Sequence, residues 1–317
     1  MLTLPQRLNP GDTVGLIAPA SAPVDPQAID KSLDALENLG FKPKLARNVR
    51  KRWGFVAGGD RDRAADIMQM FADRKVHGIL CVRGGYGTGR LLNLLDYSVA
   101  RKNPKVFAGY SDITALHCAF MKEANLLTFH SPMAASDFIK KPGSRFARKS
   151  FLAMVTQPQP YGSIRRGYKK ETISILRRGK VSGQLIGGNI CLLANLIGTR
   201  FLPDFRKKIL FFEDVDEEPF RYDRMITHLL NVGLLQQVAG IAIGQNTNCE
   251  DPKRKTVKEY RQTLMDVFRD RLLPLKIPIV AGLPFGHIPD NATIPVGCHA
   301  TLDAVNGDLI LTSTAVK

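Results

Sequence analysis

One serine stands at a position where a nucleophile could act. The segment KVFAGYSDITALH (105–117) predicts a short apolar strand from Val106, a sharp turn at Ser111, and a helix that begins near Ile113. A serine between a strand and a helix holds its hydroxyl at the mouth of an α/β sheet, beside free backbone N–H groups. The motif GYSDI lacks the last glycine of the esterase signature G-x-S-x-G, so two roles stay open for Ser111: nucleophile or helix N-cap.

The glycine-rich loop RGGYGTGRLL (83–92) follows another predicted strand. Gly84 and Gly89 have the Walker spacing, but Arg90-Leu91 stands where a phosphate loop requires Lys and Ser or Thr. A dinucleotide fingerprint is also incomplete, because Arg90 replaces its third glycine. Two interpretations remain. The backbone could approach a substrate closely and point N–H groups at it, as an oxyanion hole requires, or the loop is a tight strand–helix turn.

Two further residues could complete a site for acyl transfer. Glu213 ends the apolar run ILFFE, which would place it at the edge of a sheet. His287 lies in the Gly- and Pro-rich segment LPFGHIPDN after a predicted strand, and loops at strand ends often carry chemistry. His130 also follows a strand and is a weaker candidate for the base. A serine, a histidine, a carboxylate and a glycine loop at strand ends are the parts of an acyl-transfer site.

Metal chemistry and secretion have little support in the sequence. The acidic run EDVDEE (213–218) could bind a hard cation, but it lacks the spacing of a calcium loop. The five cysteines are scattered without a C-x-x-C pair, so we expect no zinc site, no disulfide framework and reduced thiols. The chain shows no signal-peptide pattern and no apolar stretch of the roughly 18 residues that a membrane span needs. We therefore expect a cytoplasmic protein without membrane insertion.

The elements that would position Ser111 alternate between strands and helices. Throughout residues 1–139, buried-type apolar runs precede segments with apolar residues at helical spacing. This alternation predicts an N-terminal α/β domain with a doubly wound parallel sheet, as in flavodoxins and amidotransferases. Ligands bind beyond the carboxyl ends of the strands in such sheets, and both Ser111 and the glycine loop follow strands.

The pattern changes at about residue 173. Residues 173–317 mix β-segments with helices, one of them predicted over 254–272, and the chain finishes in β-structure alone. Asn306-Gly307 between two alternating runs is a strong hairpin signal. We therefore expect a smaller, β-rich mixed C-terminal domain that carries Glu213 and His287.

The positive charge is concentrated in one segment. Residues 140–180 contain twelve Lys or Arg and one acid, so they account for +11 of the net charge of +16. We interpret 140–172 as a basic connection between the domains, with a solvated surface. The alternative is an anion-binding patch for an acidic substrate, a membrane surface or nucleic acid. No RNA- or DNA-binding motif accompanies the charge, so we expect no nucleic-acid partner.

Six blocks of the sequence together resemble the LD-carboxypeptidases, or muramoyl-tetrapeptide carboxypeptidases. In chain order they are PGDTVGLIAPAS, RGGYGTGRLL, GYSDITALH, GGNICLLANLIGT, FFEDVDEEPFRYDR and AGLPFGHIPDNATIPVG. The resemblance covers nearly the whole chain and implies a catalytic triad of Ser111, Glu213 and His287. It also implies the two-domain fold expected above, a site between the domains, a homodimer, and no metal or other cofactor.

The resemblance implies the mechanism of a serine peptidase. His287 would take the proton of Ser111 as the hydroxyl attacks a peptide carbonyl, and Glu213 would orient the imidazole and stabilise its cation. We expect the backbone N–H groups of Gly85 and Asp112 to hold the oxyanion. Water would then hydrolyse the acyl-enzyme.

The implied substrate is the murein tetrapeptide of peptidoglycan recycling, cut between its L-centred diamino acid and its terminal D-alanine. A carboxypeptidase must also hold a free carboxylate, and Arg83 and Asn189 lie in matching motifs as candidates. Some similar proteins instead cleave peptidyl-nucleotide antibiotics and confer self-immunity, which is the nearest alternative. An alternative function of another class is that of an anion- or nucleic-acid-binding protein that uses residues 140–180.

Overall fold

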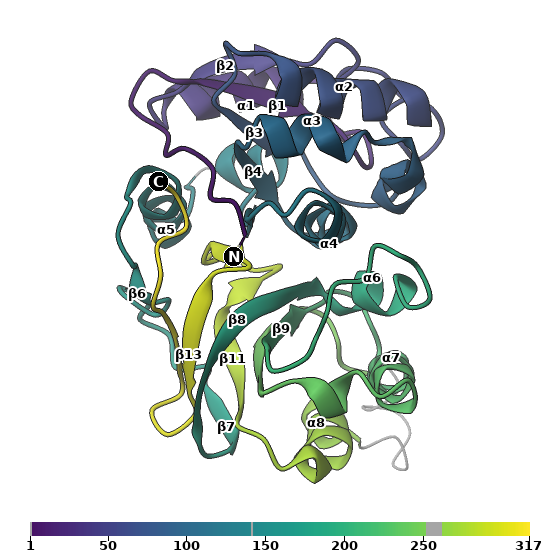
Figure 1. Cartoon of the computed structure of the whole chain (residues 1–317), viewed down its shortest axis with the longest axis vertical. Coiled ribbons are helices and arrows are strands. Elements are labelled where there is room, and N and C mark those ends of the chain that lie inside the picture. Colours follow the sequence, from purple (N-terminus) through teal and green to yellow (C-terminus); the bar gives the residue numbers. More distant parts are fainter. Residues whose placement is uncertain (1, 141, 252–261) are drawn as a thin grey trace.

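The computed structural model describes residues 2–140, 142–251 and 262–317. Its strands form a six-stranded sheet and an eight-stranded sheet (Figure 1). Both sheets contain parallel strands, so the predicted α/β fold with a second, β-rich sheet domain is confirmed. The part of the predicted helix 254–272 that precedes residue 262 lies outside the described residues.

The first sheet contains the strand that leads to Ser111. Its order is β12-β5-β4-β3-β1-β2, and every neighbouring pair among β1 to β5 is parallel. The order 2-1-3-4-5 is that of flavodoxin-like doubly wound sheets. The side chains of β3, β4 and β5 are buried throughout, as expected for strands covered on both faces. The five strands are β1 (Thr13–Ile17), β2 (Lys42–Leu45), β3 (Gly78–Cys81), β4 (Val106–Gly109) and β5 (Thr128–His130).

Helical segments follow these strands. The one that matters most for the site is α4 (Thr114–Glu123), which continues the turn at Ser111 and buries all residues from Thr114 to Met121. The glycine loop after β3 leads into a 3₁₀ helix, η1 (Thr88–Leu94), and Ser111 itself begins a second one, η2 (Ser111–Ile113). The others are α1 (Ala28–Glu37), α2 (Asp60–Ala72), α3 (Tyr97–Lys102) and the π-helical turn η3 (Ala134–Phe138).

The second sheet presents a row of polar residues at one edge. Its order is β6-β14-β13-β8-β9-β10-β11-β7, and β8 to β11 run parallel to one another. Their carboxyl ends carry Asn189, Glu213, Gln245 and Gly286, the last being followed directly by His287. The strands are β6 (Gly162–Ser163), β7 (Ser174–Arg177), β8 (Lys180–Asn189), β9 (Ile209–Glu213), β10 (Gly240–Gln245), β11 (Ile279–Gly286), β13 (His299–Asp303) and β14 (Asp308–Leu311).

Helices connect the parallel strands of this sheet. The amphipathic α7 (Pro219–Asn231) buries Tyr222, Ile226 and Leu229, and it packs on α8 (Leu264–Leu272). Thr263 and Asp266 form a capping box that begins α8. Other segments in the described residues are α6 (Ile190–Asn195) and the 3₁₀ turns η4 (Leu235–Gln237) and η6 (Leu273–Leu275). The predicted hairpin at Asn306-Gly307 is confirmed, because β13 and β14 pair antiparallel on either side of it.

One strand from the C-terminal half joins the N-terminal sheet. β12 (Ile294–Val296) pairs antiparallel with β5 instead of extending the second sheet. The chain end also returns to the start, because Lys317 and Arg7 share a backbone hydrogen bond of 2.9 Å (Figure 1). The second half of the sequence therefore contributes a strand to the first domain.

The segment 140–172 is folded in its described part. It contains α5 (Arg145–Thr156) and β6, and Ser144 caps α5 by accepting from the backbone N–H of Ala147. Ser144 Oγ also donates to Asp290 Oδ1 at 2.7 Å, and Lys170 Nζ lies 2.9 Å from Asp290 Oδ2. The segment thus holds Asp290, three residues beyond His287, which a solvated linker would not do.

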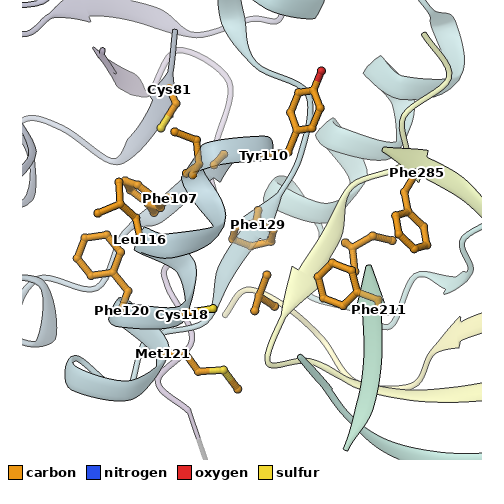
Figure 2. Close-up of a cluster of buried hydrophobic side chains, with 14 of the residues drawn as sticks. Cys81, Phe107, Tyr110, Leu116, Cys118, Phe120, Met121, Phe129, Phe211 and Phe285 are labelled. Atoms are coloured by element: carbon orange, nitrogen blue, oxygen red, sulfur yellow. The ribbon is translucent and has the colours of Figure 1, made fainter. Parts of the chain in front are cut away.

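Apolar side chains fill the seam between the two sheets. Figure 2 shows Phe107, Phe120 and Phe129 of the first domain on one side, and Phe211 and Phe285 of the second domain on the other. All five are fully buried, and burial of each phenyl ring contributes about 1.5–3 kcal/mol to folding. The two sheets therefore share one continuous core, which holds their carboxyl edges against each other.

Candidate active site

Ser111 occupies a strained turn at the end of β4. Its φ is +65°, a left-handed conformation that non-glycine residues adopt rarely and mostly where the surroundings enforce it. The glycine loop packs closely on this turn, since a Cβ at Gly84 would lie 2.9 Å from Ser111 Cβ. Strand, strained turn and helix together form the geometry of a nucleophile elbow, although the last glycine of its sequence motif is missing.

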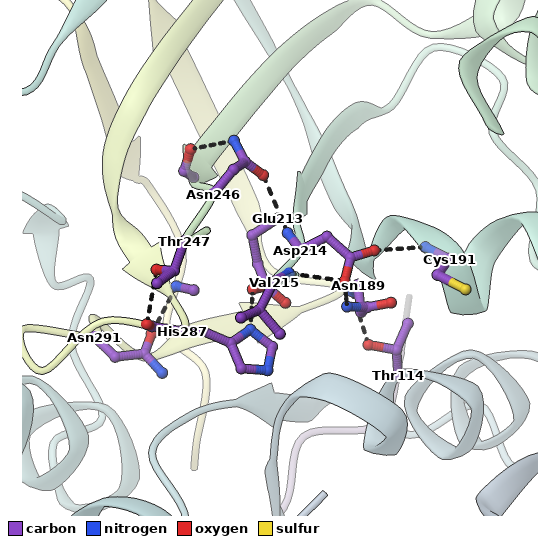
Figure 3. Close-up of polar contacts among 12 residues, drawn as sticks. Thr114, Asn189, Cys191, Glu213, Asp214, Val215, Asn246, Thr247, His287 and Asn291 are labelled. Atoms are coloured by element: carbon purple, nitrogen blue, oxygen red, sulfur yellow. Dashed lines mark hydrogen bonds and ion pairs between the residues drawn. The ribbon is translucent and has the colours of Figure 1, made fainter. Parts of the chain in front are cut away.

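Glu213 and His287 form a hydrogen-bonded pair. Nδ1 of His287 lies 2.6 Å from Oε2 of Glu213, and the carboxylate is completely buried at the end of β9 (Figure 3). Burial alone would lower the pKa of His287, but the charge and hydrogen bond of Glu213 outweigh it and raise that pKa above its ordinary value. With Nδ1–H donated to Glu213, Nε2 is left free to accept a proton.

The loop that carries His287 is held on both sides. Thr247 Oγ1 donates to the carbonyl of His287 at 2.9 Å, and the N–H of Gly286 donates to Asn291 Oδ1 at 3.1 Å. Gly286 has φ of +117°, and a Cβ there would lie 3.1 Å from Glu213 Oε2. A glycine is therefore needed where the backbone passes over the carboxylate.

The domain seam brings this pair to Ser111. The ring of Tyr110, the residue before Ser111, lies 4.8 Å from the imidazole of His287, centroid to centroid. The hydrogen bonds of the described residues include none between Ser111 and His287 themselves. Such contacts are often long in free enzymes and shorten when substrate binds. The three residues of the predicted triad thus come from the two sides of one seam, two from the second domain and one from the first.

The predicted oxyanion donors come from two segments, the glycine loop and the turn at Ser111. The backbone N–H groups of Gly85 and Asp112 donate no hydrogen bond to the residues that the structure describes. Gly85 has φ of +112°, and a Cβ there would lie 2.5 Å from Ser21 Oγ. The Asp112 carboxylate faces away, accepting from the N–H of Thr88 at 2.8 Å. Both N–H groups remain predicted donors.

The two predicted carboxylate-binding residues lie in different surroundings. Arg83 is half-buried, and its guanidinium makes a long contact of 3.4 Å with the carbonyl of Ala22. Asn189 is buried, and its side chain already donates to Asp214 and accepts from the N–H of Leu192 as the N-cap of α6. Arg83 therefore keeps free donors for a substrate, whereas both ends of the Asn189 amide are engaged within the chain.

Two carboxylates near the triad were not predicted from the sequence. Asp214 follows Glu213 and is buried, which together with the Glu213 charge raises its pKa to about 7. Asp137 lies in the π-helical turn η3, where burial raises its pKa, and its charge acts on His287. The only signal for Asp214 was its place in the run FFED, and Asp137 had no signal because its segment lacks any chemical motif.

Metal-ligand clusters and long apolar helices are absent from the described part of the chain. Among those residues, no three His, Cys, Asp or Glu side chains come together as metal ligands. Within residues 2–140, 142–251 and 262–317, no helix is long and apolar enough to cross a membrane. A cavity of about 870 Å³ lies between α1 and the segment around Lys140, and the triad does not line it.

Comparisons with known proteins match the chain in sequence and in fold. Sequence models of the LD-carboxypeptidase N-terminal and C-terminal domains match residues 14–131 and 182–302. A probable murein peptide carboxypeptidase of Bacillus subtilis is 38% identical over 309 residues, which cover 97% of this chain and 93% of that protein. The murein tetrapeptide carboxypeptidase of Pseudomonas aeruginosa is 31% identical, with 92% of each chain covered.

A solved structure shows the same fold. MccF in complex with glutamyl sulfamoyl guanosine superposes with a TM-score of 0.88 at 23% identity, covering 99% of each chain. The resemblance in six sequence blocks is confirmed by the two domain models and by relatives named as carboxypeptidases over nearly the full length. The chain therefore belongs to the LD-carboxypeptidase family.

Proposed function

We propose that this protein is a serine carboxypeptidase that hydrolyses the L,D peptide bond to terminal D-alanine in murein tetrapeptides. The observation that carries the proposal is the 2.6 Å contact between His287 and Glu213, at a seam that also holds the strained Ser111. Murein peptides are the substrates named for the relatives from B. subtilis and P. aeruginosa. As in those relatives, the substrate would be a short peptide with a free carboxylate.

The chemistry follows from the protonation of His287. Nε2 takes the proton of Ser111 Oγ, which attacks the carbonyl carbon and forms the C–O bond of an acyl-enzyme. The imidazolium then gives that proton to the leaving amine of D-alanine as the C–N bond breaks. Water repeats the sequence, with Nε2 as base, and releases the shortened peptide. Glu213 keeps Nδ1 protonated and stabilises the cation throughout.

The negative oxygen of the tetrahedral intermediate needs donors that are already in place. The N–H groups of Gly85 and Asp112 are suitable because no described acceptor uses them. Loss of one such donor would lower kcat about 100-fold. We assign the free carboxylate of the substrate to Arg83, because its guanidinium retains free donors whereas the Asn189 amide is engaged within the chain.

The test is to incubate the protein with murein tetrapeptide and measure released D-alanine by mass spectrometry. Wild type should release D-alanine, and Ser111→Ala should release almost none. Equal release by both proteins would refute the serine mechanism. Failure of the wild type to release any would refute the substrate. A control with the diastereomer that ends in L-alanine should stay uncut.

A peptidyl-nucleotide is the second candidate substrate. It is favoured by the superposition on MccF, whose complex contains glutamyl sulfamoyl guanosine. Incubation with an aminoacyl sulfamoyl nucleoside, beside tetrapeptide at equal concentration, separates the two. Preference for the nucleoside by a larger kcat/KM would replace our assignment.

The basic segment supports an anion-binding role less than its charge suggests. Lys170 pairs with Asp290, Lys180 with Asp303, and Arg165 donates to the carbonyls of Asn306 and Gly307. These pairs neutralise or occupy part of its charge. A nucleic-acid-binding protein would retain random-sequence DNA at low salt and release it steeply as salt rises.

We also propose that the protein is cytoplasmic and forms a homodimer. Light scattering on the purified protein would measure its oligomeric state.

A further inference from the structure

A buried chain of hydrogen bonds crosses the domain seam beside the triad. The backbone N–H of Asn189 donates to Thr114 Oγ1 at 2.9 Å, and Asn189 Nδ2 donates to Asp214 Oδ1 at 2.6 Å. Figure 3 shows Thr114 on one side of the seam with Asn189 and Asp214 on the other. Thr114 belongs to the first domain, so the chain of contacts joins the two domains.

Each end of this chain lies next to a catalytic residue. Thr114 begins α4, three residues after Ser111, and its N–H closes the turn by donating to the Ser111 carbonyl. Asp214 directly follows Glu213 on β9. Asn189 lies opposite Glu213 in the parallel register of β8 and β9. The hydrogen bonds therefore connect the nucleophile turn to the strand that holds the acid.

The connection is buried and held by several hydrogen bonds. Thr114, Asn189 and Asp214 are exposed by 0%, 3% and 4% of their surface. Asp214 accepts two further bonds, from the N–H of Cys191 at 3.2 Å and from its own neighbour Val215 at 2.9 Å. A buried carboxylate with this many donors has one stable orientation, because any other would leave buried N–H groups unpaired.

The backbone also comes unusually close at this crossing. Gly188 has φ of +139°, and a Cβ there would lie 2.4 Å from Thr114 Oγ1 and 2.7 Å from its methyl group. Only glycine lets β8 approach α4 at this distance. The approach places the N–H of Asn189 on the threonine hydroxyl, so close packing and hydrogen bonding act together here.

We propose that Asp214 is a positioning residue, which through Asn189 and Thr114 sets the distance between Ser111 and the Glu213–His287 pair. Triad residues that come from two domains need such a fixed link, since a displacement of about 1 Å can cost about 100-fold in rate. The inference rests on the proposed function, because it concerns the alignment of that triad. It reassigns Asn189 from the substrate to the seam.

The charge of Asp214 also reaches the catalytic pair. It raises the pKa of His287, together with the larger contributions of Glu213. The titratable groups that face Asp214 are Glu213 on its own strand, His287, Cys191, Cys249 and Tyr222. The pKa of Asp214 is itself about 7, so its charge acts on His287 mainly above that pH. Removal of this charge should therefore lower the pKa of His287 and move the acid limb of kcat/KM to lower pH.

The first test is Asp214→Asn, which keeps the shape and removes the charge and one acceptor. We expect kcat for murein tetrapeptide to fall about 10- to 100-fold, while KM stays within about twofold of wild type. The acid limb of the kcat/KM profile should shift to lower pH. The matched control is Asp303→Asn. Asp303 is likewise buried and accepts two backbone N–H groups and an asparagine amide, but it lies in the β13–β14 hairpin. The control should change neither kcat nor the limb.

Variants of Thr114 give an independent test if Asp214→Asn fails to fold. Thr114→Val keeps the volume and removes the acceptor, whereas Thr114→Ser keeps the acceptor and removes the methyl group. If the hydroxyl positions the seam, the valine variant loses at least tenfold in kcat and the serine variant stays near wild type. The reverse order would mean that Thr114 acts through packing, and the proposal would be overturned.

A double-mutant cycle tests whether Asp214 and Thr114 act together, and a labelling assay tests the reactivity of Ser111. Asp214→Asn and Thr114→Val act on one chain of contacts, so the double variant should be little worse than the worse single variant. Full additivity would overturn the proposal, as would wild-type kcat and an unmoved acid limb in Asp214→Asn. Labelling of Ser111 by a fluorophosphonate checks the wild type separately. A wild type that neither labels nor releases D-alanine would refute the proposed function instead.

Discussion

The ring of Tyr110 lies 4.8 Å from the imidazole of His287, although the two residues come from different domains. Tyr110 is buried and immediately precedes Ser111, so its ring is a packing surface between the turn at Ser111 and the imidazole of His287. Burial holds its pKa well above the ordinary value, which keeps the phenol neutral beside Glu213 and Asp137. The ring, and not a charge, is what Tyr110 offers to His287.

Replacement of Tyr110 should separate its ring from its hydroxyl. Tyr110→Phe keeps the contact with His287 and should retain kcat within about threefold. Tyr110→Ala removes the ring and should lower kcat by at least about tenfold, because the imidazole loses the surface that orients it. D-alanine release under saturating tetrapeptide measures both. A phenylalanine variant as damaged as the alanine variant would show that the hydroxyl acts in the reaction.

Replacement of Glu213 by Gln should nearly abolish activity. The variant keeps the shape but loses the acceptor charge on Nδ1–H of His287, and a comparable change in a serine protease triad costs about 10⁴-fold in kcat. Asp66→Asn is the control for loss of a buried carboxylate, since Asp66 is buried against Asn48 and belongs to none of the sequence motifs that carry the triad. A glutamine variant within tenfold of wild type would contradict the assigned role.

The acid limb in the pH profile of wild-type kcat/KM should have its midpoint at a pH above the ordinary pKa of histidine. His287 acts as a base only when neutral, and the charge of Glu213 raises its pKa above 6.5. The rate kcat/KM should therefore fall as the pH drops through a value above 6.5, while the protein remains folded by circular dichroism. A limb midpoint below 6.5 would mean that burial, and not Glu213, controls the imidazole.

The glycine loop should tolerate a methyl group at one position and not at another. Gly85→Ala would place Cβ 2.5 Å from Ser21 Oγ at φ of +112°, so the loop must move and its N–H with it. We expect a loss of about 100-fold in kcat, as for a lost oxyanion donor. Gly89→Ala, in the same loop, meets nothing within 4 Å and is the matched control. Equal kcat in both variants would remove Gly85 from the oxyanion site.

His130 should make the protein less stable in acid. It is fully buried among Tyr110, Phe211 and Phe285, neither ring nitrogen has a described partner, and burial lowers its pKa far below 6.5. The unfolded chain takes up a proton below pH 6.5 and the folded protein does not, so stability falls as pH falls. Between pH 7 and pH 5 this one residue should account for about 2 kcal/mol.

Urea unfolding of His130→Leu at the two pH values measures that contribution. The variant should lose about 2 kcal/mol less than wild type on going from pH 7 to pH 5. His117, whose pKa burial lowers to about 4, contributes in both proteins and cancels from the comparison. His299→Gln, which changes an exposed histidine, should leave the wild-type difference unchanged. An equal loss in His130→Leu and wild type would contradict the assignment.

Local signals in the sequence were sufficient to predict the main elements and to place Ser111, Glu213 and His287 at or just after strand ends. The apolar run before Ser111 and the helical spacing after it predicted strand, turn and helix, because each depends on neighbouring residues alone. The alternation of strands and helices predicted the parallel sheet, and Asn306-Gly307 predicted the final hairpin. These features follow from backbone preferences and from side-chain periodicity, which a sequence displays directly.

Contacts between distant residues needed the tertiary structure. Glu213 and His287 are 74 residues apart, and only the parallel order of β9, β10 and β11 brings their strand ends together. The sequence pattern of β12 predicted a strand but could not say which of the two sheets the strand would join. Its pairing with β5 depends on which sheet edge lies next to it in the folded protein. Asn189 has the same polar amide in either role. Its neighbours Thr114 and Asp214, which come from two domains, decided that the amide is engaged within the seam.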